Sequence, residues 1–419
     1  MQIIVFSKLL TPRIKYIFNF IFKEILKAEV EFTGNSDYFS QSGHVKISYG
    51  DKPLADELFF KNASLLLSNK VEELKLKTVS FGDYHAPFPV EESTLPFDVF
   101  AASFFILSRY EEYLHKNNSE ADFSAKDSLQ YKWKVLKRPI IDEWALLLKN
   151  MIRKKHPSFK FHEKKFYHQP TINFVLKPDV PAGFFSKTKF IFTSAFNKQQ
   201  KFLSSVFDDL TGLGIDVKET INDLDQLHIK NQPIYFIRFP QDDKNRLSFE
   251  SRASFLKEKQ IGLSEPCSND NGKSTTLKND LSKFSKFQNR TGNFRSQQLA
   301  LLKLPACYLH LLSAGITSDY SMGYSDYVGF RAGTCTPFNW YDLQLEKVTP
   351  IIVKSYAISD TAIQYQNFDD AIKTIKEFID AVKLVDGHFY SSWQLKKLSE
   401  NAKFKKWKAV FNEMINYAG

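Results

Sequence analysis

The chain has 419 residues, of which 43% are hydrophobic and 25% are charged, with only 16 Gly and 16 Pro. These values exclude a disordered or repetitive chain and leave room for two domains, each with its own core. Lys and Arg outnumber Asp and Glu by 57 to 47, and this net charge of +10 favours acidic partners such as anionic glycans or lipid head groups. Because the basic residues form no long run, nucleic-acid binding is not expected.

The first 155 residues alternate between strand and helix patterns. Short apolar or alternating runs predict strands at 2–6, 29–32 and 44–49. Apolar residues at helical spacing, or in one long apolar run, predict helices at 12–27, 97–114 and 138–154. Asp98 is expected to cap the second helix, and Pro139 lies at the entry to the third. The opening region is therefore expected to be α/β.

A polar and basic stretch at 155–169 separates this region from the rest of the chain. We therefore predict two domains, 1–165 and 166–419. Beyond the boundary the pattern predicts two strands and two helices in alternation, at 171–176, 199–213, 233–239 and 248–259. Short apolar strands that alternate with helices are typical of a parallel sheet or barrel.

Residues 268–294 are rich in Ser, Asn and Lys, and 272–275 read Gly-Lys-Ser-Thr, like the end of a phosphate-binding loop. The earlier glycine of such a loop is replaced by Cys267, and we do not expect this segment between a buried strand and a helix. Nucleotide binding is therefore not predicted.

The three cysteines and the N-terminal segment bear on location. Cys267, Cys307 and Cys335 are odd in number and form no C-x-x-C pair, so neither a disulfide framework nor a zinc ribbon is expected. A reducing compartment follows, and we place the protein in the cytoplasm. Residues 1–22 are interrupted by basic residues and predict neither a signal peptide nor a membrane span. Residues 17–25 are apolar enough to predict a peripheral membrane contact.

Three neighbouring segments carry the most distinctive sequence. Residues 319–324 read Asp-Tyr-Ser-Met-Gly-Tyr, residues 329–338 read Gly-Phe-Arg-Ala-Gly-Thr-Cys-Thr-Pro-Phe, and residues 340–343 read Trp-Tyr-Asp-Leu. Further segments match in order and spacing, at 95–98, 108–113, 169–172, 304–305 and 407–418. Together they resemble a large bacterial family of polysaccharide deacetylase (NodB-like) proteins with an N-terminal α/β domain. The resemblance implies an α/β fold in which a smaller α/β domain precedes a distorted (β/α) barrel of the NodB type.

The chemistry that the resemblance implies is metal-assisted amide hydrolysis. A divalent ion, usually zinc, is held by one Asp and two His, polarises the acetyl carbonyl and activates a water. A second Asp takes the proton of that water, and a late His gives a proton to the departing amine.

Five residues of this chain stand where the resemblance places those groups, and none can do the same chemistry. Asn173 and Val175 replace the base and the metal-binding Asp, and Ser264 replaces the first His ligand. Gln298 replaces the second His ligand, and Gln394 replaces the catalytic acid. An amide cannot accept the proton, and an isopropyl group cannot bind a metal. We therefore expect no metal or other cofactor.

Four other residues of the same region are candidates for binding. Arg331 would orient the base in an active relative, and here it is expected either to anchor an anion or glycan or to brace the barrel. Trp340, Tyr341 and Trp393 could line a sugar groove, because aromatic faces pack on sugar rings, or could pack in the core.

These losses favour a pseudoenzyme that binds a glycan or a protein partner without hydrolysing it. A second interpretation is an active hydrolase whose substitute site uses Glu265, Asp179 or His388, and it predicts a bound metal. A third is a scaffold subunit of a larger assembly, which predicts a co-purifying protein and an exposed apolar patch.

Overall fold

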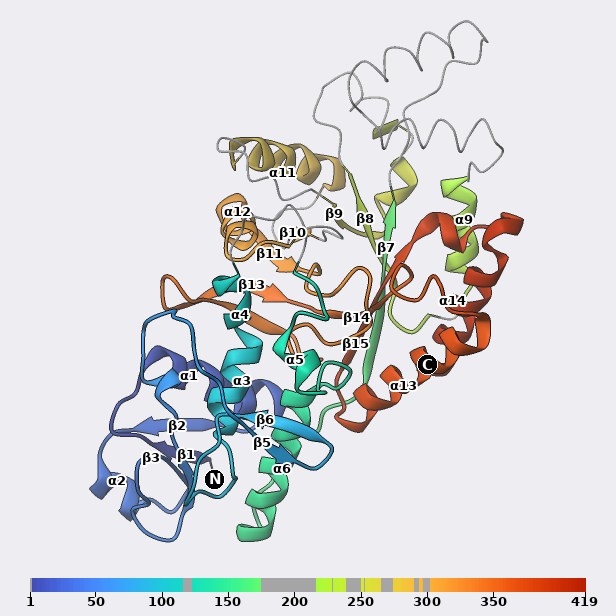
Figure 1. The fold of residues 1–419 in the computed structure, drawn as a ribbon. Helices are drawn as coiled ribbons and strands as arrows, with labels where there is room; N and C mark the ends of the chain where they lie inside the picture. The colour runs from blue at the N-terminus through green and yellow to red at the C-terminus, as the bar shows by residue number, and fades with distance from the viewer. Residues whose placement is uncertain are drawn as a thin grey trace, which may run out of the picture.

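The structure is a computed structural model that describes residues 2–115, 123–174, 216–227, 229–238, 250–251, 253–264, 274–289, 294–296 and 302–419 (Figure 1). The helix predicted at 199–213 lies outside these residues. The described part is a mixed α/β structure with two parallel sheets, as the alternating strand and helix patterns predict.

The N-terminal region contains a four-stranded parallel sheet in the order β2-β1-β3-β4. Its strands are β1 (Ile3–Phe6), β2 (Val30–Thr33), β3 (Val45–Gly50) and β4 (Leu58–Lys61). All four residues of β1 are buried, which explains its uninterrupted apolar sequence. The three strands predicted in this region are therefore confirmed. A separate antiparallel pair consists of β5 (Thr78–Phe81) and β6 (Tyr84–Pro87).

The helix predicted at 12–27 is divided into α1 (Pro12–Asn19) and a π-helical turn, Phe20–Ile25. Its apolar side chains from Ile17 onward are buried in the N-terminal core. These side chains pack in the protein core, and the predicted membrane contact through 17–25 stays a prediction. Within the described ranges, no helix is long and apolar enough to cross a bilayer.

The helix predicted at 97–114 is interrupted at Arg109. α3 (Val99–Leu107) is completely buried, and the Asp98 carboxylate caps it by accepting from two backbone N–H groups, as predicted. Arg109 has a left-handed backbone with φ 57°, which is uncommon outside glycine, and α4 (Tyr110–Leu114) begins directly after it. The other helices of the region are α2 (Ser36–Gln41), α5 (Leu129–Lys132) and α6 (Ile140–Lys155), the last of which confirms the prediction at 138–154.

The larger sheet has nine strands in the order β12-β13-β11-β10-β9-β8-β7-β15-β14, all parallel except β12. Its strands are β7 (Tyr167–Phe174), β8 (Ile234–Ile237), β9 (Gln260–Leu263), β10 (Phe294–Ser296), β11 (Ile316–Asp319), β12 (Phe338–Asp342), β13 (Lys347–Val353), β14 (Tyr356–Ser359) and β15 (His388–Gln394). The strands predicted at 171–176 and 233–239 correspond to β7 and β8.

This sheet curls until its two ends meet. β13 and β14 stand seven steps apart in the strand order, which would be about 34 Å in a flat sheet. Only Lys354 and Ser355 separate the two strands along the chain, and that link spans at most about 11 Å. The rings of Tyr320, directly after β11, and Tyr390 on β15 are 5.7 Å apart although their strands are five steps apart. The sheet therefore encloses an interior.

Helices cover the outward face of the curled sheet (Figure 1). They are α9 (Val217–Asp225), α11 (Ser274–Gln288), α12 (Ala306–Ala314), α13 (Phe368–Leu384) and α14 (Lys405–Ala418). The last two lie to the right of β7 in Figure 1, whereas the N-terminal sheet lies at the lower left.

Two predictions in this half differ from the structure. Of the helix expected at 248–259, residues 250–251 are helical, whereas Ser254–Leu256 form a short 3-10 turn that leads into β9, so the helix does not extend to 259. Conversely, the polar stretch 268–294 contains α11, whose leucines and phenylalanines recur at helical spacing and are buried. Of residues 272–275, Ser274 and Thr275 begin α11 and the other two lie outside the described residues, so the expected absence of a phosphate-binding loop stays a prediction.

The two large sheets lie on either side of the predicted domain boundary along the chain, but one hydrophobic core cluster contains residues from both sides. One core cluster joins residues of 3–161 to residues of 302–353, and the other lies around the outward face of the large sheet. The division into 1–165 and 166–419 stays a prediction.

The cysteines differ from expectation. Cys307 is disulfide-bonded, whereas Cys335 is a free and buried thiol. The expected absence of disulfides is therefore wrong, because an odd number of cysteines does not exclude one bridge. The reducing compartment loses the support that the cysteines gave it.

Candidate functional site

Side-chain alternation defines the inward face of the large sheet. Ile172, Ile237 and Leu263 pack beneath the outer helices. Because successive side chains of a strand point to opposite faces, their neighbours Asn173 and Phe236 point into the interior.

One line of register partners crosses this interior near the carboxyl ends of the strands. In order from β15, the register partners are Gln394, Asn173, Phe236 and Gly262. Arg295 of β10 continues the line, because the next residue, Ser296, pairs with Leu263, the residue after Gly262. Parallel α/β sheets bind their ligands at the carboxyl ends of the strands. This line, which we call the strand-end line, is therefore the candidate functional site.

Gly262 allows the line to close tightly at its centre. A Cβ atom at this position would lie 2.5 Å from the Phe236 ring and 2.9 Å from the carbonyl oxygen of Arg295. The Phe236 ring therefore lies against the backbone of β9, and its centroid is 5.3 Å from that of Tyr320.

The structure brings together the predicted positions that it describes. Asn173 and Gln394 are direct register partners on β7 and β15. The Asn173 amide is buried and donates to the Ser392 hydroxyl at 3.4 Å, and the Gln394 amide donates to the Thr361 hydroxyl at 3.5 Å. Ser264 follows β9 on the same inward face, and its N–H donates to a carbonyl of β8. Val175 and Gln298 lie outside the described residues.

These side chains do not fit a zinc ion. Amide and hydroxyl groups are poor zinc ligands compared with imidazole, thiolate and carboxylate. Within the described part of the chain, no three His, Cys, Asp or Glu residues gather where they could hold a metal. The donor groups along the strand-end line therefore disagree with the zinc site that the resemblance implies.

The substitute residues give no alternative among the described positions. Asp179 and Glu265 lie outside the described residues. His388 was expected near the vacated positions, but it begins β15, six residues and about 20 Å along the strand from Gln394. Burial, reinforced by Lys164, lowers the pKa of His388 to about 4, so it is neutral near pH 7.

The β10 end of the strand-end line is cationic, which the sequence did not predict. Lys354, directly after β13, donates from Nζ to the Tyr320 hydroxyl at 2.9 Å and lies 5.1 Å from the centroid of that ring. Arg295 is within hydrogen-bonding reach of the same hydroxyl. Burial, and next the charge of Arg295, lower the pKa of Lys354. No signal in the sequence indicated Arg295 and Lys354, because neither β10 nor β13 was predicted as a strand.

Asp319 lies beside this end but faces outward. Its buried carboxylate accepts from the hydroxyls of Ser296, Tyr308 and Ser321 at 3.0, 2.9 and 2.6 Å, and from the Ser321 N–H. Burial raises its pKa. The carboxylate therefore joins β10, β11 and α12 rather than neutralising Lys354.

Arg331 is fully buried and binds Glu112 of α4. Its Nε and Nη2 donate to the two carboxylate oxygens at 2.9 and 2.8 Å, and Arg109 donates to the same carboxylate at 2.8 Å. Burial opposes ionisation of Glu112, but Arg331 and Arg109 outweigh it and hold its pKa below the ordinary value. The structure thus gives Arg331 a bracing role, and its role as an anion or glycan anchor stays a prediction.

The motif around Arg331 makes a second contact with the N-terminal region. The Asp142 carboxylate of α6 accepts from the hydroxyls of Thr334 and Thr336 and from the N–H of Cys335, at 2.6, 2.5 and 3.1 Å. We call these two buried contacts, through Glu112 and Asp142, the junction. They join the regions on either side of the predicted domain boundary.

The three aromatic candidates lie in the core. Trp340, Tyr341 and Trp393 are at most 2% exposed. Trp340 packs on Tyr308, and Trp393 on Phe411 of α14. The structure therefore gives them a packing role, and the sugar groove that they were expected to line stays a prediction.

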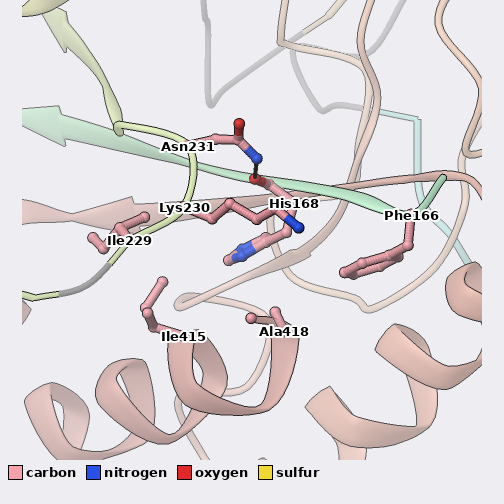
Figure 2. Close-up of a pocket in the computed structure, with 8 residues that line it drawn as sticks. Phe166, His168, Ile229, Lys230, Asn231, Ile415 and Ala418 are labelled. Atoms are coloured by element: carbon pink, nitrogen blue, oxygen red, sulfur yellow. Dashed lines mark hydrogen bonds between the residues drawn. The ribbon is translucent and has the colours of Figure 1, made fainter.

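A small pocket lies elsewhere, between the start of β7 and α14. Figure 2 shows the His168 imidazole directed toward Ile415 and Ala418 of α14, while Asn231 donates to the His168 carbonyl at 2.8 Å. His168 lies four residues before Ile172 on β7 and therefore shares its outward face, near the start of the strand, whereas Asn173 lies near its carboxyl end. The pocket is therefore separate from the strand-end line.

Comparisons with known proteins leave the family open. Residues 3–157, less than half of the chain, match a model described as a family of unknown function (DUF7033). No curated protein matches. The chain is similar to a crystal structure described as a polysaccharide deacetylase from Mycobacterium smegmatis, with 10% identity and a TM-score of 0.38 over 62% of this chain and 85% of that one. A likeness at this level carries no argument about function.

Proposed function

We propose that this protein is a non-catalytic, glycan-binding member of the polysaccharide deacetylase type. In this proposal a (β/α) barrel of the NodB type, 166–419, follows an α/β domain, 1–165. The curled sheet supports the barrel. The separate strand sets support the division, as does the N-terminal family match, which ends at residue 157.

The observation that carries the proposal is the chemistry of the strand-end line. Asn173 and Gln394 are register partners on one inward face, and Ser264 follows on β9. Amides and hydroxyls both donate and accept hydrogen bonds, as sugar hydroxyls require. None of the three titrates near neutral pH, so none can serve as a general acid or base.

Two measurements on the full chain test this function. Acetate release from acetylated chito- and xylo-oligosaccharides is expected to stay at background with and without added zinc. Binding of neutral and acidic oligosaccharides by calorimetry is expected to give a measurable affinity for at least one of them. Zinc-dependent acetate release, or no binding across the panel, would contradict the proposal.

Variants locate the bound glycan. Asn173→Ala and Gln394→Ala are each expected to weaken binding about threefold to tenfold, the effect of one neutral hydrogen bond. Asn416→Ala removes an exposed amide from α14 and is the matched control. An equal loss in the control and in the two site variants would place the glycan elsewhere.

A further inference from the structure

The cationic end of the strand-end line has positive charge without a matching carboxylate. Within the described part of the chain, no Asp or Glu lies within ion-pair distance of Arg295 or Lys354. The nearby Asp319 carboxylate is occupied on the other face by three hydroxyls. The two cations instead share Tyr320 as a hydrogen-bond partner, and their like charges repel each other.

This end of the interior is open to solvent. Arg295 and Lys354 are half-buried, as is Ser318, the register partner of Arg295 on β11. Ile352, which pairs with Ser318 on β13, is 38% exposed. A ligand can therefore reach both cations, and Gln394 at the other end of the line is half-buried as well.

The groups match one kind of ligand. A guanidinium presents a planar fork of donors that fits a carboxylate, and an ammonium adds a second point charge. The Tyr320 hydroxyl, already held by Lys354, adds a hydrogen-bonding group between them. Arg295 lies three strands from Asn173, no more than about 14 Å, which a short oligosaccharide can span.

We propose that Arg295, Lys354 and Tyr320 bind a carboxylate of the glycan, so that the natural ligand is an acidic, uronate-type sugar rather than a neutral one. This inference rests on the proposed glycan-binding function and names its ligand class. An anion between the two cations would remove their mutual repulsion in a partly desolvated site.

Calorimetry on the full chain with three probes tests the inference: trigalacturonic acid, its neutral methyl ester, and inorganic phosphate. The acid is expected to bind at least tenfold more tightly than the ester. Arg295→Gln and Lys354→Gln are each expected to weaken binding of the acid about tenfold, the effect of one charge-assisted hydrogen bond. Lys347→Gln removes an exposed charge at the start of β13 and is expected to change neither affinity.

The outcomes separate the two proposals. Equal affinities for acid and ester, or equal losses in Lys354→Gln and Lys347→Gln, would overturn the acidic ligand and leave glycan binding intact. Phosphate binding as tight as the acid would show a general oxyanion site and overturn the sugar assignment. Failure of both trisaccharides to bind would overturn both proposals. Unchanged affinity for the ester in Arg295→Gln and Lys354→Gln shows that these variants are folded.

Discussion

The junction and the strand-end line are both rich in polar side chains, but the junction contains ionised carboxylates in short hydrogen bonds, whereas Asn173 and Gln394 of the strand-end line are neutral amides. At the junction, Glu112 accepts from two arginines and Asp142 accepts three hydrogen bonds, all at 3.1 Å or less. Along the strand-end line, the neutral Asn173 amide donates to the Ser392 hydroxyl at 3.4 Å and the Gln394 amide to the Thr361 hydroxyl at 3.5 Å. Buried carboxylates with short, charge-assisted hydrogen bonds hold a fold together, whereas neutral amides can exchange hydrogen bonds with a ligand.

This difference changes the meaning of the most distinctive motif. Residues 329–338 stand out in the sequence, and Arg331 resembles a residue that supports catalysis. In the structure their polar groups bind Glu112 and Asp142 of the N-terminal region. A motif that stands out can therefore reflect the joining of two parts of a chain.

The largest expected effect is at the junction. Glu112→Ala leaves Arg331 and Arg109 buried without their shared carboxylate, which should lower the free energy of unfolding by about 3–5 kcal/mol. Urea unfolding followed by circular dichroism measures this change. Glu143→Ala breaks the partly exposed pair with Arg138 and should lower it by about 1 kcal/mol or less. Similar losses in both variants would show that the junction stabilises the fold no more than a partly exposed ion pair does.

The next effect concerns His168. Its side chain is buried, and its Nε2 has no hydrogen-bond partner in the described part of the chain. Burial, and next Lys383, lower its pKa to about 4 from an ordinary value of about 6.5. Between about pH 6.5 and pH 4, this histidine is protonated in the unfolded chain but neutral in the folded protein. Protonation therefore favours the unfolded chain, and stability is lost as the pH falls through this range. The loss attributable to this group approaches ~3 kcal/mol at the acid end.

His168→Gln should remove that part of the pH dependence. His388, whose pKa burial also lowers to about 4, remains, so the loss between pH 7 and 4.5 should become smaller but should not disappear. The midpoints of urea unfolding at pH 7 and pH 4.5, for the wild-type chain and for the variant, measure this loss of stability. An unchanged difference between the midpoints would contradict the assignment.

The rate at which a reagent labels Cys335 reports how often the junction opens. This cysteine is buried beside Asp142, and burial raises its pKa well above the ordinary value, so a thiol reagent should reach it only through opening. In Glu112→Ala, labelling by iodoacetamide should be about 100-fold faster, because a loss near 3 kcal/mol raises the open population by that factor. Mass spectrometry locates the label. Equal rates in Glu112→Ala and Glu143→Ala would mean that the junction does not control access to Cys335.

The sequence predicted structure well where one physical signal dominates a segment. β1 and α3 are buried on all sides, and their apolar runs show it. α11 was missed because its polar composition outweighed four apolar residues at helical spacing. The interruption at Arg109 could not be predicted, because its reason is a buried ion pair that also involves Arg331, more than two hundred residues away.

The site was predictable only in part for a similar reason. Asn173 and Gln394 were found from motif positions, but their pairing depends on β7 and β15 meeting across a long stretch of chain. Arg295 and Lys354 were not found, because only the curl of the sheet brings β10, β11 and β13 around Tyr320. A local pattern cannot report such a long-range approach.

The smallest expected effect on stability completes the comparison. The double variant Asn173→Ala, Gln394→Ala removes two neutral amides and leaves no buried charge unpaired, so the free energy of unfolding should fall by only about 1–2 kcal/mol. The same variant should bind oligosaccharide at least tenfold more weakly, since both proposed contacts are lost. Urea unfolding and calorimetry on the same preparation measure the two quantities. A fall of about 3 kcal/mol or more would mean that the strand-end line stabilises the protein as strongly as the junction, and its residues would then serve the fold rather than a ligand.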